Sequence, residues 1–141
     1  MKAIGHFLVI AIACSAWLPG ANPAAACNVC VEDKIAATYD WQVVSEAKRN
    51  GHIMIFAAIS GRITPGDETM ARAVRRLLST VGGVHEGTVR VSLAPAAASF
   101  ACDRRRKPSE VVQVMNRRLR RHGLALTIVR IGAPQDPVVG R

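Results

Sequence analysis

The connection between two short apolar segments near the middle of the chain most strongly limits the possible folds. Residues 88–93 (TVRVSL) alternate between apolar and polar side chains, and residues 97–102 form a second, small-residue strand pattern. Only Ala94, Pro95 and Ala96 lie between them. A crossover between parallel strands needs about a dozen residues or more. The two segments are therefore predicted to form an antiparallel hairpin.

Apolar periodicity places further elements on both sides of this hairpin. An apolar run ending before Ser60 predicts a buried strand, and Thr64 with Pro65 is typical of a helix start. A second helix opens at Pro108 and is closed by Gly123. The predicted elements around the hairpin are a strand at 52–59, a helix at 64–81, a helix at 108–122 and a strand at 124–131.

The order strand, helix, strand, strand, helix, strand predicts an α+β fold with ferredoxin-like βαββαβ topology. In this fold a four-stranded antiparallel sheet carries two helices on one face, and the crossovers are right-handed. Residues 31–49 are predicted to add an N-terminal helix, because their apolar residues recur along one stripe. The stripe comprises Val31, Ile35, Tyr39, Val43 and Ala47. Residues 52–131 form the predicted domain, and residues 132–141 a loose, flexible tail.

Residues 1–26 have the pattern of a signal peptide. Lys2 precedes an apolar run at 7–18, and small residues at Ala24 and Ala26 suit cleavage before Cys27. The apolar run is too short for a bilayer, which takes about 20 residues, so a retained anchor is the weaker alternative. The sequence predicts an exported, periplasmic protein whose N-terminal segment, residues 27–51, begins at Cys27.

Cys27 and Cys30 form a CxxC motif at this predicted new N-terminus. Two thiolates can hold Cu(I) or Zn(II), and the same spacing can close a small disulfide. Cys102 and His52 are the next candidates for ligands, although the phase of Cys102 with Phe100 favours a buried side chain. His85 and His122 are further candidates that read first as ordinary loop and helix-end residues.

Lipidation of Cys27 is a third reading. In lipoproteins, small residues directly precede the modified cysteine, and a leucine usually stands just before them. Here Ala25 and Ala26 fit, but Ala24 stands where the leucine is expected. A thioether to lipid would consume the sulfur of Cys27 and leave Cys30 alone. Ordinary cleavage is therefore the main prediction, and a lipid-anchored protein is the alternative.

Catalysis is not predicted. No Ser/His/Asp constellation or pair of carboxylates stands out on the predicted elements, so we assign no catalytic residues. A thiol–disulfide oxidoreductase is the least unlikely enzyme. It would need a strand leading into the CxxC helix, and the predicted mature chain has no residues before Cys27 to form one.

The chain is strongly basic, with 19 Lys and Arg against 10 Asp and Glu and a net charge of +9. For an exported protein this predicts contact with anionic envelope phosphates, or simply a solvated basic helix face. No nucleic acid is expected, because no aromatic residues interleave with the arginines as a stacking platform requires. The clustered arginines are Arg104, Arg105, Arg106, Arg117, Arg118, Arg120 and Arg121.

Residues 53–131 resemble a heavy-metal-associated domain, a small ferredoxin-like module that handles copper and zinc. The resemblance is best over residues 87–121, which are similar to the middle hairpin and following helix of that family. It implies soft-metal binding and a metal-donor or metal-acceptor protein as partner. The family binds metal through a GMxCxxC loop after the first strand. Here residues 60–66 (SGRITPG) contain no cysteine, so no metal ligand is carried over to that loop.

Overall fold

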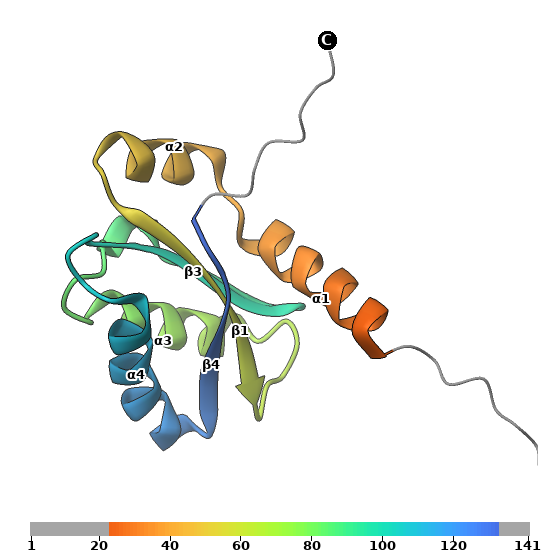
Figure 1. Cartoon of the computed structure of the whole chain (residues 1–141). Coiled ribbons are helices and arrows are strands. Elements are labelled where there is room, and N and C mark those ends of the chain that lie inside the picture. The colour runs from red at the N-terminus through yellow and green to blue at the C-terminus, as the bar shows by residue number, and fades with distance from the viewer. Residues whose placement is uncertain (1–22, 133–141) are drawn as a thin grey trace, which may run out of the picture.

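A computed structural model describes the backbone of residues 23–132 and the side chains of residues 31–132. A four-stranded antiparallel sheet lies between two layers of helices (Figure 1). The predicted α+β class with a four-stranded antiparallel sheet is confirmed. Most of the predicted signal peptide and nearly all of the predicted C-terminal tail lie outside the described residues.

The sheet has the strand order β2-β3-β1-β4. The predicted hairpin is confirmed, because β2 pairs antiparallel with β3 across the Ala94–Pro95 turn, with Val91 opposite Ala98. β1 lies in the centre and pairs antiparallel with both β3 and β4. The strands are β1 (Ile53–Gly61), β2 (Arg90–Leu93), β3 (Ala96–Cys102) and β4 (Leu124–Ile131).

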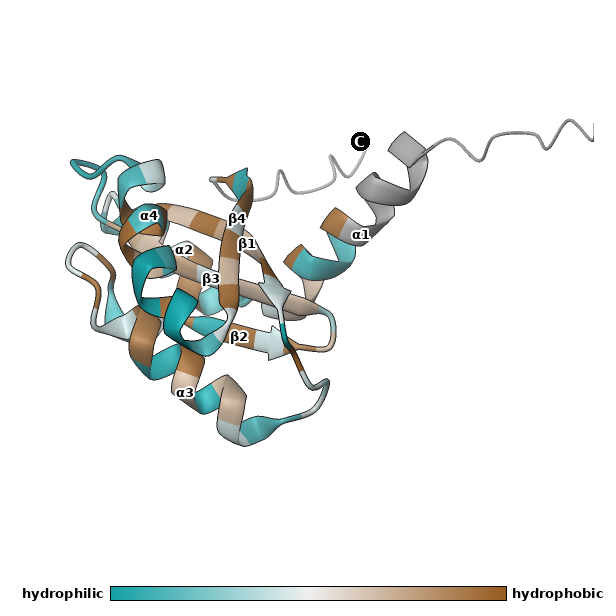
Figure 2. Cartoon of the chain, turned by 90° about the horizontal axis from the view of Figure 1, so that it is seen from below, coloured by the Kyte–Doolittle hydropathy of each residue, from teal (hydrophilic) through white to brown (hydrophobic). Residues whose placement is uncertain are grey.

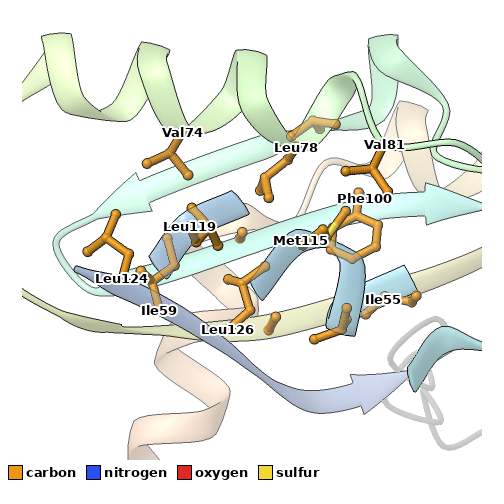
Figure 3. Packing of buried hydrophobic residues seen from close by; sticks show 14 of the residues in the cluster. Ile55, Ile59, Val74, Leu78, Val81, Phe100, Met115, Leu119, Leu124 and Leu126 are labelled. Carbon is orange, nitrogen blue, oxygen red and sulfur yellow. The ribbon is translucent and has the colours of Figure 1, made fainter. Parts of the chain in front are cut away.

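Helices α3 (Glu68–Ser79) and α4 (Pro108–Leu119) cover one face of the sheet. Their apolar sides meet alternate residues of the strands, as a pleated sheet with one face in the core requires. Figure 3 shows Leu78 and Met115 directed into this core beside Phe100. All three side chains are fully buried. Burial between these two helices and the sheet is therefore the main apolar core of the domain.

Helices α1 (Pro23–Thr38) and α2 (Trp41–Arg49) lie against the opposite face (Figure 1). A smaller cluster forms there, in which Ile35 of α1 and Val44 of α2 pack against Met54 and Phe56 of β1. Two short 3₁₀ helices complete the fold, η1 (Glu86–Thr88) and η2 (Arg120–His122).

The prediction of one continuous helix over residues 31–49 is wrong. The chain breaks at Tyr39 and Asp40, where the extended Asp40 caps α2 by accepting hydrogen bonds from the backbone N–H groups of Gln42 and Val43. An aspartate at this position satisfies donors that the first turn leaves unpaired, so it starts a new helix. The predicted stripe nevertheless packs as expected: Val31, Ile35, Tyr39, Val43 and Ala47 all belong to the smaller cluster.

Two other predicted boundaries also shift, each at a residue whose side chain hydrogen-bonds to the backbone. Asp67, rather than Thr64, is the N-cap of α3, and its carboxylate accepts from the N–H of Met70 at 2.9 Å. Thr88 belongs to η1 instead of β2, and its hydroxyl accepts from the N–H of Ala101 while donating to the carbonyl of His85. In both places a side-chain oxygen replaces a backbone partner.

Candidate functional site

The candidate metal ligands Cys27 and Cys30 lie within α1, which begins four residues before Cys27, at Pro23. Proline suits the first turn of a helix, and the alanines that follow are the best helix formers. The helix predicted to begin at residue 31 therefore begins earlier in the full chain and includes both cysteines. Residues three apart on a helix are neighbours on its surface, so the backbone places the two cysteines on one side of α1.

The described part of α1 is fixed to the sheet through three kinds of contact. Ile35 is 3 % exposed and packs in the smaller cluster. At the end of the helix, the buried Ser99 hydroxyl of β3 donates to the carbonyl of Thr38 at 2.7 Å. Nearer the cysteines, Glu32 forms an ion pair with Arg130 of β4. These contacts hold α1 across the sheet face that α3 and α4 do not cover.

Cys102, the first candidate for an additional ligand, is buried in the main core on the opposite side of the sheet. It is fully buried and packs among the residues under α3 and α4, in phase with Ala98 and Phe100 as predicted. Burial, followed by the neighbouring carboxylate of Asp103, raises the pKa of its thiol. A raised pKa disfavours the thiolate that binds metal. The fold therefore does not bring Cys102 to the helix that carries Cys27 and Cys30.

His52, the second candidate, lies just before β1 and stacks on His85, which the sequence analysis treated as a separate loop residue. The ring centroids are 3.5 Å apart, with 22° between the ring planes. Burial and the nearby His52 lower the pKa of His85, while Asp103 acts in the opposite direction. Stacked rings direct their in-plane nitrogen lone pairs side by side, which does not suit one shared metal ion.

A preformed cluster of ligands is not found among the side chains that the structure describes. No three His, Cys, Asp or Glu residues of that part of the chain converge in a way that could hold a metal ion. His122, the remaining histidine candidate, is exposed in η2 at the end of α4. The fold therefore does not gather the described candidates Cys102, His52 and His122 into one site.

A polar tie that the sequence analysis missed joins the α1–α2 layer to the edge of the sheet. Arg90 of β2 donates to the Asp40 carboxylate from two guanidinium nitrogens, at 2.9 and 3.1 Å. The N–H of Val43, and then Arg90, hold the pKa of Asp40 below its ordinary value. The signal in the sequence was Asp40 itself, because aspartate is a preferred N-cap residue.

The seven arginines singled out from the sequence are all exposed and form two groups, one before α4 and one at its end. Three occupy the loop after β3, and four occupy the last turn of α4 and η2. Within this group the structure records one polar side-chain contact, from Arg118 to the hydroxyl of Thr80 at 2.7 Å. None of the seven forms an ion pair with a carboxylate of the described residues.

The chain was compared with known families, with curated proteins and with solved structures, and no match was found. Across residues 23–132, none of the helices combines the length and the apolar character that crossing a bilayer requires.

Proposed function

We propose that this chain is an exported, non-enzymatic protein that binds a soft metal ion through Cys27 and Cys30. The metal-binding helix is carried on a ferredoxin-like domain that resembles the heavy-metal-associated modules. Its partner is a protein that donates metal to it or accepts metal from it. The protein acts in the periplasm after cleavage before Cys27.

The strand pairing supports the ferredoxin-like assignment. Two strand–helix–strand units are joined by the β2–β3 hairpin, and the two central strands are β1 and β3. This arrangement is consistent with the split βαβ plan and supports the proposal. α1 and α2 are additions that precede the plan and cover the face that it leaves open.

The observation that carries the metal proposal is the placement of both cysteines on one side of a single helix, away from other candidate ligands. The loop between β1 and α3, where the resembled family holds its metal, contains no cysteine. A closed zinc site takes about four ligands, whereas soft thiolates also select Cu(I). With two thiols and no converging third group among the described side chains, Cu(I) fits better than Zn(II).

Titration of the reduced protein with Cu(I) in the presence of a competing chelator tests this proposal. We expect one equivalent of Cu(I) to bind, and binding to be lost in the C27S/C30S variant. Cys102→Ala is the matched control, because it removes a buried thiol from the other side of the sheet and should leave Cu(I) binding unchanged. Equal affinity in the unmodified and C27S/C30S proteins would refute the metal site.

The alternative function is a structural or interaction module in which Cys27 and Cys30 form a disulfide, or in which Cys27 carries lipid. The oxidising compartment that export implies favours the disulfide. Intact mass of the processed protein separates these cases. An acyl increment on the N-terminal peptide identifies the lipoprotein, and a loss of two hydrogens that a reductant restores identifies the disulfide.

A further inference from the structure

The outer face of α3 and α4 carries most of the positive charge of the molecule. Residues 62–86 and 103–123, which form these helices and their flanking loops, contain twelve Lys and Arg against five Asp and Glu. Residues 23–51, which form α1 and α2 on the other side of the sheet, contain three against four. The two sides therefore carry net charges of +7 and −1.

The fold adds three arginines to those that the sequence had grouped. Arg72, Arg75 and Arg76 of α3 are exposed, and α3 lies beside α4 on the same face of the sheet. Arg118 of α4 reaches Thr80, just after α3, so the two basic helices are in direct polar contact. Figure 2 shows the hydrophilic colour on the outward sides of both helices. Two helices and a loop thus contribute exposed arginines to this side of the molecule, which we call the basic surface.

The basic surface keeps its charge available. Among the described residues, the one ion pair on this side joins Lys107 to Glu110, and no arginine of α3, α4 or η2 pairs with a carboxylate. Close, unpaired guanidinium groups repel one another, so they are stabilised by an external anion. Arginine forks bind phosphate oxygens in pairs, which makes phosphate the preferred anion.

The surface is hollowed beside β2. A cleft of about 690 Å³ has Arg75 and Arg76 on one wall and Gly87 and Arg90 on the other, with Glu86 also in its lining. Arg90 is held by Asp40 and by the carbonyls of Gly87 and Val89, so Arg75 and Arg76 are the groups that can turn to a ligand. The cleft therefore offers the guanidinium groups of Arg75 and Arg76 to a phosphate.

We infer that the outer face of α3 and α4 docks onto a lipid surface that bears phosphate groups. The choice of lipid over nucleic acid has two grounds. The described aromatic residues lie elsewhere: Tyr39 and Trp41 belong to the α1–α2 side, and Phe56 and Phe100 are buried in the sheet. Among the described residues, the face therefore has no Phe, Tyr or Trp side chain on which bases could stack. The second reason to choose lipid is the proposed export of the protein. The inference rests on the proposed function for this reason alone.

Docking on this face is electrostatic, without deep insertion. The large exposed apolar side chains of the described residues are Trp41 and Ile131, and neither lies on α3 or α4. Basic residues near an anionic bilayer each strengthen binding by roughly fivefold, and the attraction falls off within a Debye length. Binding must therefore weaken steeply as salt is raised.

Co-sedimentation with vesicles of phosphatidylglycerol in phosphatidylcholine tests the inference. We expect the purified protein to bind these vesicles at low salt and not to bind phosphatidylcholine alone. The variant R72Q/R75Q/R76Q should lose about a hundredfold in partitioning. Glutamine is as good a helix former as arginine, so α3 is retained.

The matched control is K34Q/K48Q/R49Q, which removes the same charge from α1 and α2. It should change partitioning by no more than about threefold, because those side chains face away from the bilayer. Equal losses in the two triple variants would overturn the assigned face. A duplex DNA fragment of mixed sequence that binds more tightly than the vesicles at the same salt would overturn the choice of lipid.

The same measurements on the C27S/C30S background keep this inference separate from the metal proposal. That variant can neither bind metal through the cysteines nor receive lipid on Cys27. Unchanged vesicle binding supports docking through the arginines even where Cu(I) binding has failed. Loss of vesicle binding in C27S/C30S would assign membrane contact to the N-terminus instead and overturn the inference.

Discussion

The two helical layers are held to the sheet in different ways. The cluster beneath α3 and α4 contains eighteen buried residues, whereas the cluster beneath α1 and α2 contains seven. The smaller layer is supplemented by polar ties, including Thr38 with Ser99 and Asp40 with Arg90. Apolar burial is insensitive to direction, but hydrogen bonds fix a position. The α3–α4 layer therefore provides stability, and the polar ties help to set the position of the helix that carries the CxxC motif.

The largest expected effect comes from two fully buried phenylalanines on opposite faces of the sheet. Phe100 lies in the main core and Phe56 in the smaller cluster. Phe→Ala costs about 3–5 kcal/mol, and the cost depends on how well the surroundings can close the cavity. We expect Phe100→Ala near the upper end of that range and Phe56→Ala near the lower end. Urea unfolding followed by circular dichroism measures both.

The opposite order of these two stability losses would contradict the division into a main core and a smaller cluster. If Phe56→Ala lowers the free energy of unfolding as much as Phe100→Ala or more, α1 and α2 share a single core with α3 and α4. The dependence of the unfolding free energy on urea concentration, the m-value, must be the same in both variants for the free energies to be comparable.

A smaller effect is expected at the hydrogen bond that fixes the end of α1. Ser99 is fully buried, and its hydroxyl donates to the carbonyl of Thr38, itself only 4 % exposed. Ser99→Ala leaves that carbonyl unpaired, which costs about 1–3 kcal/mol. If Ser99→Ala speeds amide hydrogen exchange more in α1 than in α3, relative to the unsubstituted protein, the loss of stability is local to α1. Uniformly faster exchange throughout the domain would contradict the division into two layers.

The sheet could be predicted from the sequence because its signals are local and periodic. The alternation of Val89, Val91 and Leu93, and the short turn at Pro95, depend on a few neighbouring residues. These signals were sufficient for the antiparallel hairpin, and the phase of Cys102 with Phe100 was sufficient for its burial.

What was missed depends on contacts between distant residues. The continuous stripe from Val31 to Ala47 concealed the cap at Asp40, whose role is completed by Arg90, 50 positions away. His52 and His85 are far apart in sequence, and their stack requires the strand register that places both Ile53 and Val84 opposite Cys102. The unpaired arginines of α3 became significant only when that helix was found beside α4.

The histidine stack is where the two layers meet at one end of the sheet. The backbone N–H of His52 donates to the carbonyl of Ala47 in α2. The backbone N–H of His85 donates to the carbonyl of Ala101 in β3. His85 follows α3 in sequence, so the two rings join segments that lead from opposite layers. The charged groups that influence His85 are His52 and Asp103.

The smallest expected effect is a pH dependence that arises at this stack. Because burial and then His52 lower the pKa of His85 in the folded state, the unfolded chain binds more protons below the ordinary histidine pKa of about 6.5. The stabilising contribution is therefore complete above that value and is lost as pH falls through the lower, folded-state pKa.

NMR titration of the ring protons should show His85 titrating below its ordinary pKa. His52→Gln should raise that pKa, since it removes the neighbouring ring that lowers it but leaves the burial. His85→Gln should remove this part of the pH dependence of urea unfolding, whereas His122→Gln, in exposed η2, should retain it. An unchanged His85 titration in His52→Gln would mean that the stacked rings do not interact electrostatically, and that the two layers meet there by packing alone.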